Sequence, residues 1–265
     1  MYAVILHTHQ KLDRVARRHL TLVAGRLVAF PTAREILHFE GQNGPDASKL
    51  KDAQNVEQPW HFVNPFDLHD TQLGQQIQRH YNSLVRALKQ GDRVRAAFEA
   101  AWLAHALVDG LTPAHHYPYE QELENLRGET RHTRNGLVGR AYIRGETVLE
   151  SMQRSLRLVG PKGLLTTHAM FEAGAYMIIA PLRLSKARPN KRQLREVRDI
   201  GVVPYFQKLS KEVGAMGLYK RFYQKGWTLK LNRDIRREVA PRMALMITLA
   251  WYAALYDAGL VEGSA

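Results

Sequence analysis

The sequence predicts an all-α protein, a compact multi-helix bundle that forms a single domain over residues 1–265. Apolar residues recur at the i, i+3, i+4 spacing of a helix through nearly the whole chain. No run of alternating β-branched residues is long enough to indicate a strand. Hydrophobic residues make up 45% of the 265 residues, which is enough to bury a substantial core.

Capping residues and helix-ending residues locate the first helices. Thr8 is expected to be the N-cap of the first helix. A short second helix is expected to open at Thr32 and to end at Gly41. The polar range 41–60 that follows is expected to be a loop.

Two longer helices are expected next. Asp70 caps the first of them, which Gly91 ends, and Asp92 caps the second, which Pro113 stops. Residues 117–140 are polar and mixed in charge, so we expect a surface insertion there. Helical patterns resume in the ranges 141–158, 166–182, 191–199 and 234–258.

Two apolar stretches bear on membrane association. Tyr2 to Leu6 is too short for the apolar core of a signal peptide and has no basic segment before it. Met243 to Tyr256 is shorter than the roughly 20 residues that cross a bilayer. We therefore expect a soluble, cytoplasmic protein.

Charge and cysteine content restrict the chemistry. Lys and Arg number 38 against 25 Asp and Glu, a net charge of +13, which favours a polyanionic partner such as nucleic acid, an anionic membrane or a phosphate-bearing substrate. Cysteine is absent, so disulfides and thiolate metal sites are excluded. Any bound metal must be held by His, Asp and Glu.

Much of the positive charge lies in one segment, Arg183 to Arg237, which contains 16 Lys and Arg and four acidic residues. Six aromatic residues are interleaved with these charges: Tyr205, Phe206, Tyr219, Phe222, Tyr223 and Trp227. Exposed rings beside cations suit single-stranded nucleic acid or an anionic membrane surface. A solvated basic face whose aromatic residues lie in the core fits the same composition.

The sequence HALVDGLTPAHH, residues 105–116, carries the first chemical signal. His105 and Asp109 are four residues apart, so on a helix they share one face, which is the buried face here. A buried imidazole and carboxylate need partners, and a metal ion is one. Pro113 turns the chain so that His115 can return to the same pocket. Taken alone, the spacing also fits a simple His–Asp hydrogen bond.

Four other segments offer further ligands. His9 lies near the start of the first helix, Asp46 follows Gly-Pro in the loop, and His61 is flanked by aromatic residues. His168 and Glu172 form a second pair four residues apart. Each of these residues, taken singly, is more often structural than metal-binding.

Together these segments resemble the superfamily of bacterial zinc-dependent phospholipases C and fungal single-strand-specific zinc nucleases. The resemblance extends in order over residues 8–258 and includes the C-terminal helix. It implies three metal positions. One uses Asp46, His61, His105 and Asp109, a second uses His115, His168 and Glu172, and a third shares Asp109 and takes His9. In secreted relatives the amino group of a processed N-terminal Trp completes the third position; here His7 is the candidate replacement.

The resemblance implies a zinc-dependent phosphodiester hydrolase of the phospholipase C type, with two zinc ions expected and a third conditional on another ligand. Asp46 and Asp109 are the expected catalytic residues, and a metal-bound hydroxide attacks phosphorus in line. The long interval before His168 leaves His132 as an alternative ligand, although no carboxylate lies four residues after it. The alternatives are a single-strand-specific nuclease and a non-catalytic basic protein that binds polyanions and keeps a structural zinc.

Overall fold

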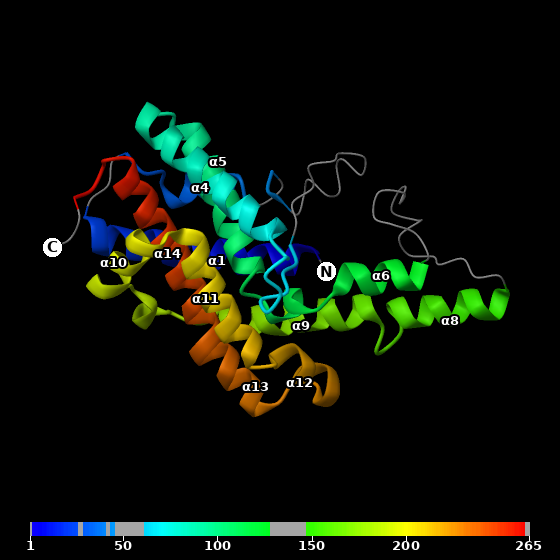
Figure 1. The fold of residues 1–265 in the computed structure, drawn as a ribbon. Coiled ribbons are helices and arrows are strands. Elements are labelled where there is room, and N and C mark those ends of the chain that lie inside the picture. The colour runs from blue at the N-terminus through cyan, green and yellow to red at the C-terminus, as the bar shows by residue number, and fades with distance from the viewer. Residues whose placement is uncertain (1, 26–28, 41–42, 46–60, 128–146, 263–265) are drawn as a thin grey trace.

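The computed structural model describes residues 2–25, 29–40, 43–45, 61–127 and 147–262 (Figure 1). In these ranges the chain is helical and contains no strand, which confirms the all-α prediction. The α-helices are α1 (Tyr2–Ala24), α2 (Ala33–His38), α4 (Gln72–Gln90), α5 (Arg93–Asp109), α6 (Tyr119–Arg127), α8 (Val148–Val159), α9 (Leu164–Ile179), α10 (Lys191–Ile200), α11 (Val202–Ala215), α12 (Leu218–Lys225), α13 (Leu229–Asp234) and α14 (Ala240–Asp257). Short 3-10 turns are η1 (Pro113–His116) and η3 (Ser185–Ala187), and a π-helical turn is η4 (Ile235–Val239).

Helix α14 forms the centre of the fold. Helices α1, α4, α5, α10 and α11 all pack against it. Every residue from Met246 to Leu255 is buried, as expected for a helix that is apolar on all sides. Trp251 in this stretch donates a hydrogen bond from Nε1 to the carbonyl oxygen of Ala100 at 3.1 Å, which ties α14 to α5.

The same region contains the one stretch of the described chain that is long and apolar enough to cross a membrane, Leu229–Asp257. Within its most apolar window 78% is buried inside the fold, at a mean hydropathy of 1.3. That degree of burial is characteristic of a core helix, in agreement with a soluble protein.

Two predicted helix starts are wrong. The first helix begins at Tyr2, so Thr8 lies inside α1 and is not its N-cap. The apolar residues before Thr8 continue the helical spacing, which lets the helix extend toward the N-terminus. Helix α4 has Thr71 as its N-cap residue, whereas Asp70 accepts a hydrogen bond from the backbone N–H of Asn64 at 2.8 Å. The Asp70 carboxylate therefore holds the preceding loop instead of the helix end.

Other predicted boundaries are confirmed. Thr32 caps α2 in a capping box with Glu35. Gly91 ends α4 in the left-handed region, with a φ of 68°, and the Asp92 side chain accepts from the backbone N–H of Arg95 at the start of α5. Helices α9, α10 and α14 match the predicted ranges to within a few residues. Most of the predicted loop 41–60 lies outside the described residues.

Replacing Glu35 by Gln is expected to lower the free energy of unfolding by about 1 kcal/mol at neutral pH. Hydrogen bonds from the Arg93 guanidinium and from Thr32 lower the pKa of Glu35 from 4.5 to about 2. The carboxylate therefore stabilises the fold fully above pH 4.5, and this contribution is lost as the pH falls toward 2. Because the side chain is partly exposed, solvent screening keeps the effect small. Urea unfolding of both proteins at several pH values between 7 and 2 measures it; a difference that persists unchanged at pH 2 would contradict this account.

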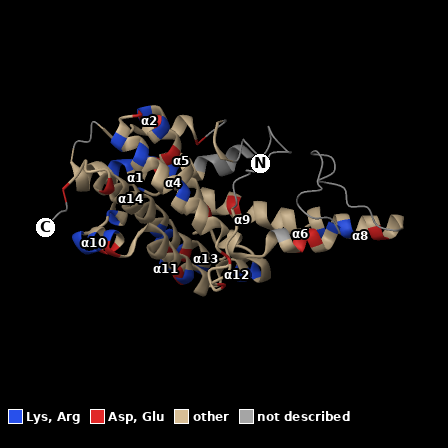
Figure 2. Ribbon diagram, turned by 45° about the horizontal axis from the view of Figure 1, so that its top comes forward, with Lys and Arg blue, Asp and Glu red and all other residues tan. Residues whose placement is uncertain are grey.

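The basic segment folds into helices that the sequence analysis did not anticipate, namely α11, α12 and α13. Four of its six interleaved aromatic side chains are buried in the core: Tyr205, Phe206, Tyr219 and Phe222. Trp227 is half-buried against that core, and only Tyr223 is exposed, at 54%. Lys and Arg lie along the outside of α10 and α11 (Figure 2). The segment is therefore a basic outer face over an aromatic interior.

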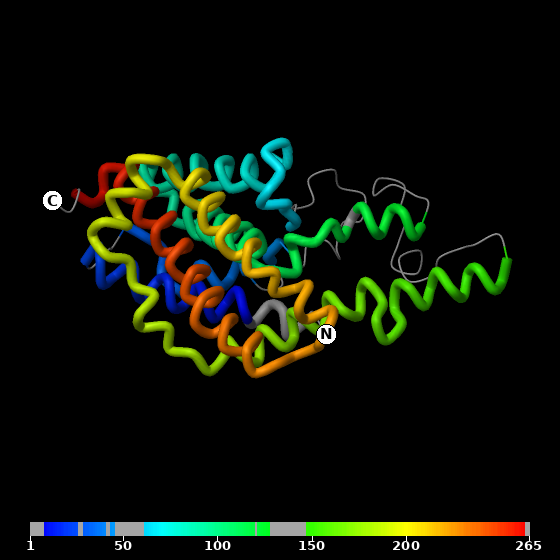
Figure 3. The backbone as a smooth tube through the Cα atoms, turned by 60° about the horizontal axis from the view of Figure 1, so that its bottom comes forward, coloured from blue at the N-terminus to red at the C-terminus, as the bar shows by residue number. Residues whose placement is uncertain are grey.

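Helices α6 and α8 pack together and extend away from the main body of helices (Figures 1 and 3). A small apolar cluster of Tyr119, Leu123 and Leu158 joins them. Part of the predicted surface insertion is thus a packed helix, α6, and residues 128–140 lie outside the described part of the chain. The base of this pair meets α9, which carries two predicted ligands.

Candidate metal centre

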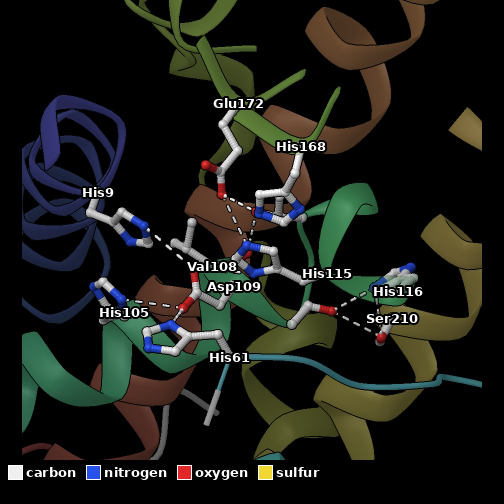
Figure 4. A network of polar contacts seen from close by, with 12 residues as sticks. His9, His61, His105, Val108, Asp109, His115, His116, His168, Glu172 and Ser210 are labelled. Carbon is white, nitrogen blue, oxygen red and sulfur yellow. Dashed lines mark hydrogen bonds and ion pairs between the residues drawn. The ribbon is translucent and has the colours of Figure 1, made fainter. Parts of the chain in front are cut away.

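Five separate segments bring predicted ligands to one place in the interior (Figure 4). The ligands are His9 on α1, His61 before α4, His105 and Asp109 on α5, His115 on η1, and His168 and Glu172 on α9. A backbone hydrogen bond from Val63 to the carbonyl oxygen of His115, 3.0 Å, fixes the His61 segment beside η1. Asp46, the alternative ligand His132 and the side chain of His7 lie outside the described residues.

Asp109 lies at the centre of four imidazole rings (Figure 4). Its Oδ2 contacts Nδ1 of His61 and lies 3.2 Å from Nε2 of His105. Its Oδ1 lies 3.5 Å from Nε2 of His9 and 3.5 Å from Nδ1 of His115. Each carboxylate oxygen therefore faces its own pair of ring nitrogens, the arrangement that a bridging carboxylate requires.

A second group forms around Glu172. Its Oε1 lies 3.0 Å from Nε2 of His115 and 3.2 Å from Nε2 of His168. The rings of His115 and His168 are stacked, with centroids 5.1 Å apart. His115 contacts Asp109 through Nδ1 and Glu172 through Nε2, so it joins the two groups.

The two groups also share a cavity. Its volume is about 30 Å³, and His9, Asp109 and Glu172 line it together with apolar side chains such as Phe171 and Met243. A space of this size holds about one or two small ligands such as water or an ion. The carboxylates of both groups therefore face a common interior space.

Both carboxylates are held in the ionised form. Burial raises the pKa of Asp109, but the imidazoles of His105, His61 and His115 together outweigh it, and the pKa falls well below its usual value. Burial likewise raises the pKa of Glu172, and His168 and His115 reverse the effect. Buried anions are costly unless cations balance them. A divalent metal ion would supply that balance here.

The donor set fits metal ions. Nitrogen and oxygen atoms of His9, His105 and Asp109 lie within 4.8 Å of one another, and those of His115, His168 and Glu172 form a second such group. Imidazole and carboxylate ligands without sulfur suit Zn²⁺.

Two acidic residues of this interior were missed by the sequence analysis. Asp13 follows His9 by four residues on α1, and the side chain is 1% exposed. Neither of its carboxylate oxygens has a hydrogen-bond partner among the described residues, and burial together with Glu40 raises its pKa. The His-x3-acid spacing repeats that of His105 and Asp109, a signal that could have revealed Asp13. Glu40, which follows α2, has no comparable signal.

The chain therefore gathers two buried His and carboxylate groups around one cavity, each able to hold a metal ion. The seven predicted ligands within the described residues all lie in these groups or contact them. Comparisons of the chain with protein-family models, with curated proteins and with solved structures found no match.

Proposed function

We propose that the chain is a zinc-dependent phosphodiester hydrolase of the phospholipase C type. One observation supports this proposal above all others: ligands from five segments converge on Asp109 and Glu172 at a single cavity. The order of these ligands along the chain is the order of the family that the sequence resembles.

The contacts of Asp109 suggest how the ions would be divided. One ion would be held by His61, His105 and Oδ2 of Asp109, with Asp46 as its expected fourth ligand. The Oδ1 side, with His9, would hold the third ion of the family pattern.

The second ion would be held by His115, His168 and Glu172, whose ligand atoms already converge. Bound ions of this kind neutralise charge on a phosphoryl group and lower the pKa of a water molecule. The chain itself supplies the buried carboxylate of Glu172, which contacts both imidazoles and holds their nitrogen atoms close together.

Aromatic side chains cover one side of the Glu172 group. The rings of Phe62 and Tyr119 are stacked, with centroids 5.3 Å apart. Phe62 lies 5.2 Å from the His115 ring, and Tyr119 lies 5.0 Å from the His168 ring. These two rings would exclude water from this side of the Glu172 group. Attraction between the bound ions and the negative charge of a phosphodiester would therefore be stronger.

The basic segment bears on the choice of substrate. Burial of four of its six aromatic side chains removes most of the rings that could stack on nucleic-acid bases. This favours a phospholipid or another small phosphodiester over single-stranded nucleic acid as the substrate. The nuclease remains the alternative, because the net charge of +13 would still attract a phosphate backbone.

The test combines metal analysis with hydrolysis of the chromogenic phosphodiester bis(p-nitrophenyl) phosphate. Protein purified without added zinc is expected to contain about two zinc ions per chain and to hydrolyse the ester until a chelator is added. Phospholipid vesicles and a single-stranded oligonucleotide, tested separately as substrates, distinguish the phospholipase from the nuclease. Metal-free protein without turnover would overturn the proposal, and retained polyanion binding would then favour the non-catalytic alternative.

A further inference from the structure

Glu40 lies on the side of the centre that is opposite Asp109. Its Oε1 accepts a hydrogen bond from Nδ1 of His105 at 2.8 Å and lies 3.4 Å from Nδ1 of His9. The Nε2 atoms of the same two rings face Asp109, at 3.2 Å for His105 and 3.5 Å for His9. Each imidazole is therefore held between two carboxylates through its two different nitrogens.

The two rings also lie parallel. Their centroids are 4.0 Å apart, with an interplanar angle of 10°. In both rings Nδ1 faces Glu40 and Nε2 faces Asp109. Oε1 of Glu40 therefore lies near both Nδ1 atoms, in a hydrogen bond with His105 and at ion-pair distance from His9. His9 comes from α1 and His105 from α5, and Glu40 links the two helices through these side chains.

A neutral imidazole has one N–H and one lone pair, and only the nitrogen with the lone pair can bind a metal. An ionised carboxylate only accepts hydrogen bonds, so contact with Glu40 favours the proton on Nδ1 and leaves the lone pair on Nε2. We infer that Glu40 is a positioning residue of the metal centre, which sets His9 and His105 as Nδ1–H tautomers and aims both Nε2 atoms at the ions. The inference rests on the proposed function for the identity of the ions.

The surrounding fold keeps Glu40 in place. Its side chain is 0% exposed, and it follows Phe39, the C-cap residue of α2. The Phe39 ring packs edge-on against Phe98 of α5, with centroids 5.6 Å apart. Helix α2 itself packs against both α1 and α5. The packing at the C-terminal end of α2 therefore places Glu40 between α1 and α5, the two helices whose histidines it contacts.

The protein contains a matched control for this interaction. Glu99 of α5 is buried like Glu40, and its Oε2 lies 2.6 Å from Nδ1 of His80. This pair repeats the carboxylate–Nδ1 contact, but neither residue belongs to the two metal-ligand groups. Glu99 also forms an ion pair with Arg95. Replacing Glu99 by Gln therefore removes the charge of a buried Glu–His pair elsewhere and weakens this additional ion pair, so it is at least as disruptive to the fold as Glu40→Gln.

The experiment uses full-length zinc-loaded protein with ¹⁵N-labelled histidine. Long-range ¹H–¹⁵N spectra of the wild type are expected to show a protonated Nδ1 in both His9 and His105, with zinc bound at Nε2 of His105 and, where the third position is filled, at Nε2 of His9. In Glu40→Gln, zinc binding measured by competition with a chelating dye should weaken by about 10–100-fold. Glu99→Gln should change zinc affinity by less than about twofold.

The opposite pattern would overturn the inference. A metal ion bound to Nδ1 in either ring of the wild type would show that Glu40 does not set these tautomers. This measurement is made on the wild type alone, so it does not depend on whether the Glu40→Gln variant folds. Equal losses of zinc affinity in Glu40→Gln and Glu99→Gln would assign the effect to general destabilisation. If the wild type binds zinc with the expected nitrogens but hydrolyses no phosphodiester, the proposed function fails and the role of Glu40 stands.

Discussion

Replacing Asp109 by Asn is expected to lower phosphodiester hydrolysis by at least about 1,000-fold, which corresponds to roughly 4 kcal/mol of transition-state stabilisation. Each Asp109 oxygen faces two imidazole nitrogens, so the residue contacts four of the predicted ligands. An amide has one carbonyl oxygen and carries no charge, so it cannot bridge two ions. The substitution should therefore also reduce the zinc content, which elemental analysis of the purified variant measures.

Glu99→Gln is the control for this variant as well. Glu99 is on the same helix, is buried to the same degree and pairs with a histidine. Its loss should destabilise the fold but leave the zinc content and turnover close to those of the wild type. If the Asp109→Asn protein keeps its zinc content and its turnover, Asp109 is not a ligand of the metal centre.

Removal of bound metal by a chelator is expected to lower the melting temperature by about 10 °C. A ligand that binds only the folded state stabilises it by roughly 4 kcal/mol at a concentration 1,000 times its Kd. For a domain of this size each kcal/mol of added stability raises the melting temperature by about 2–4 °C. The effect is expected because bound metal ions would add positive charge beside the buried carboxylates of Asp109 and Glu172, which only the neighbouring imidazoles balance in the metal-free protein.

Differential scanning fluorimetry with and without the chelator measures this shift, and added zinc should reverse it. Asp109→Asn should show a smaller shift than the wild type, because less metal is bound at the start. An unchanged melting temperature in the wild type would mean that the buried groups hold no metal under those conditions.

The parts of the site that follow helical periodicity could be predicted from the sequence. His105 with Asp109, and His168 with Glu172, lie four residues apart, and the 3.6-residue turn places each pair on one face whatever the rest of the fold does. The approach of η1 to α9 is different, since it depends on packing between segments that are distant in sequence. There the order of ligands in the resembled family supplied the expectation, and the structure brings the residues together.

Residues outside regular spacing could not be predicted. Glu40 acts from the chain just after α2, where no periodic pattern specifies a direction. Asp70 has the residue type of an N-cap, yet its carboxylate bonds to Asn64, because side-chain competition for a nearby N–H is decided by the fold of the loop. Composition likewise could not reveal that Tyr205 and Phe206 face the core while the neighbouring charges face solvent.

The dispersed origin of the ligands has a kinetic consequence. His9 lies near the start of the chain and Glu172 about two thirds of the way along it. The ligand groups can therefore assemble only after a large loop has closed. Ions that bind at that late point stabilise contacts absent from an early folding nucleus. They should therefore slow unfolding and prolong the lifetime of the native state, while leaving the rate at which the chain first collapses nearly unchanged.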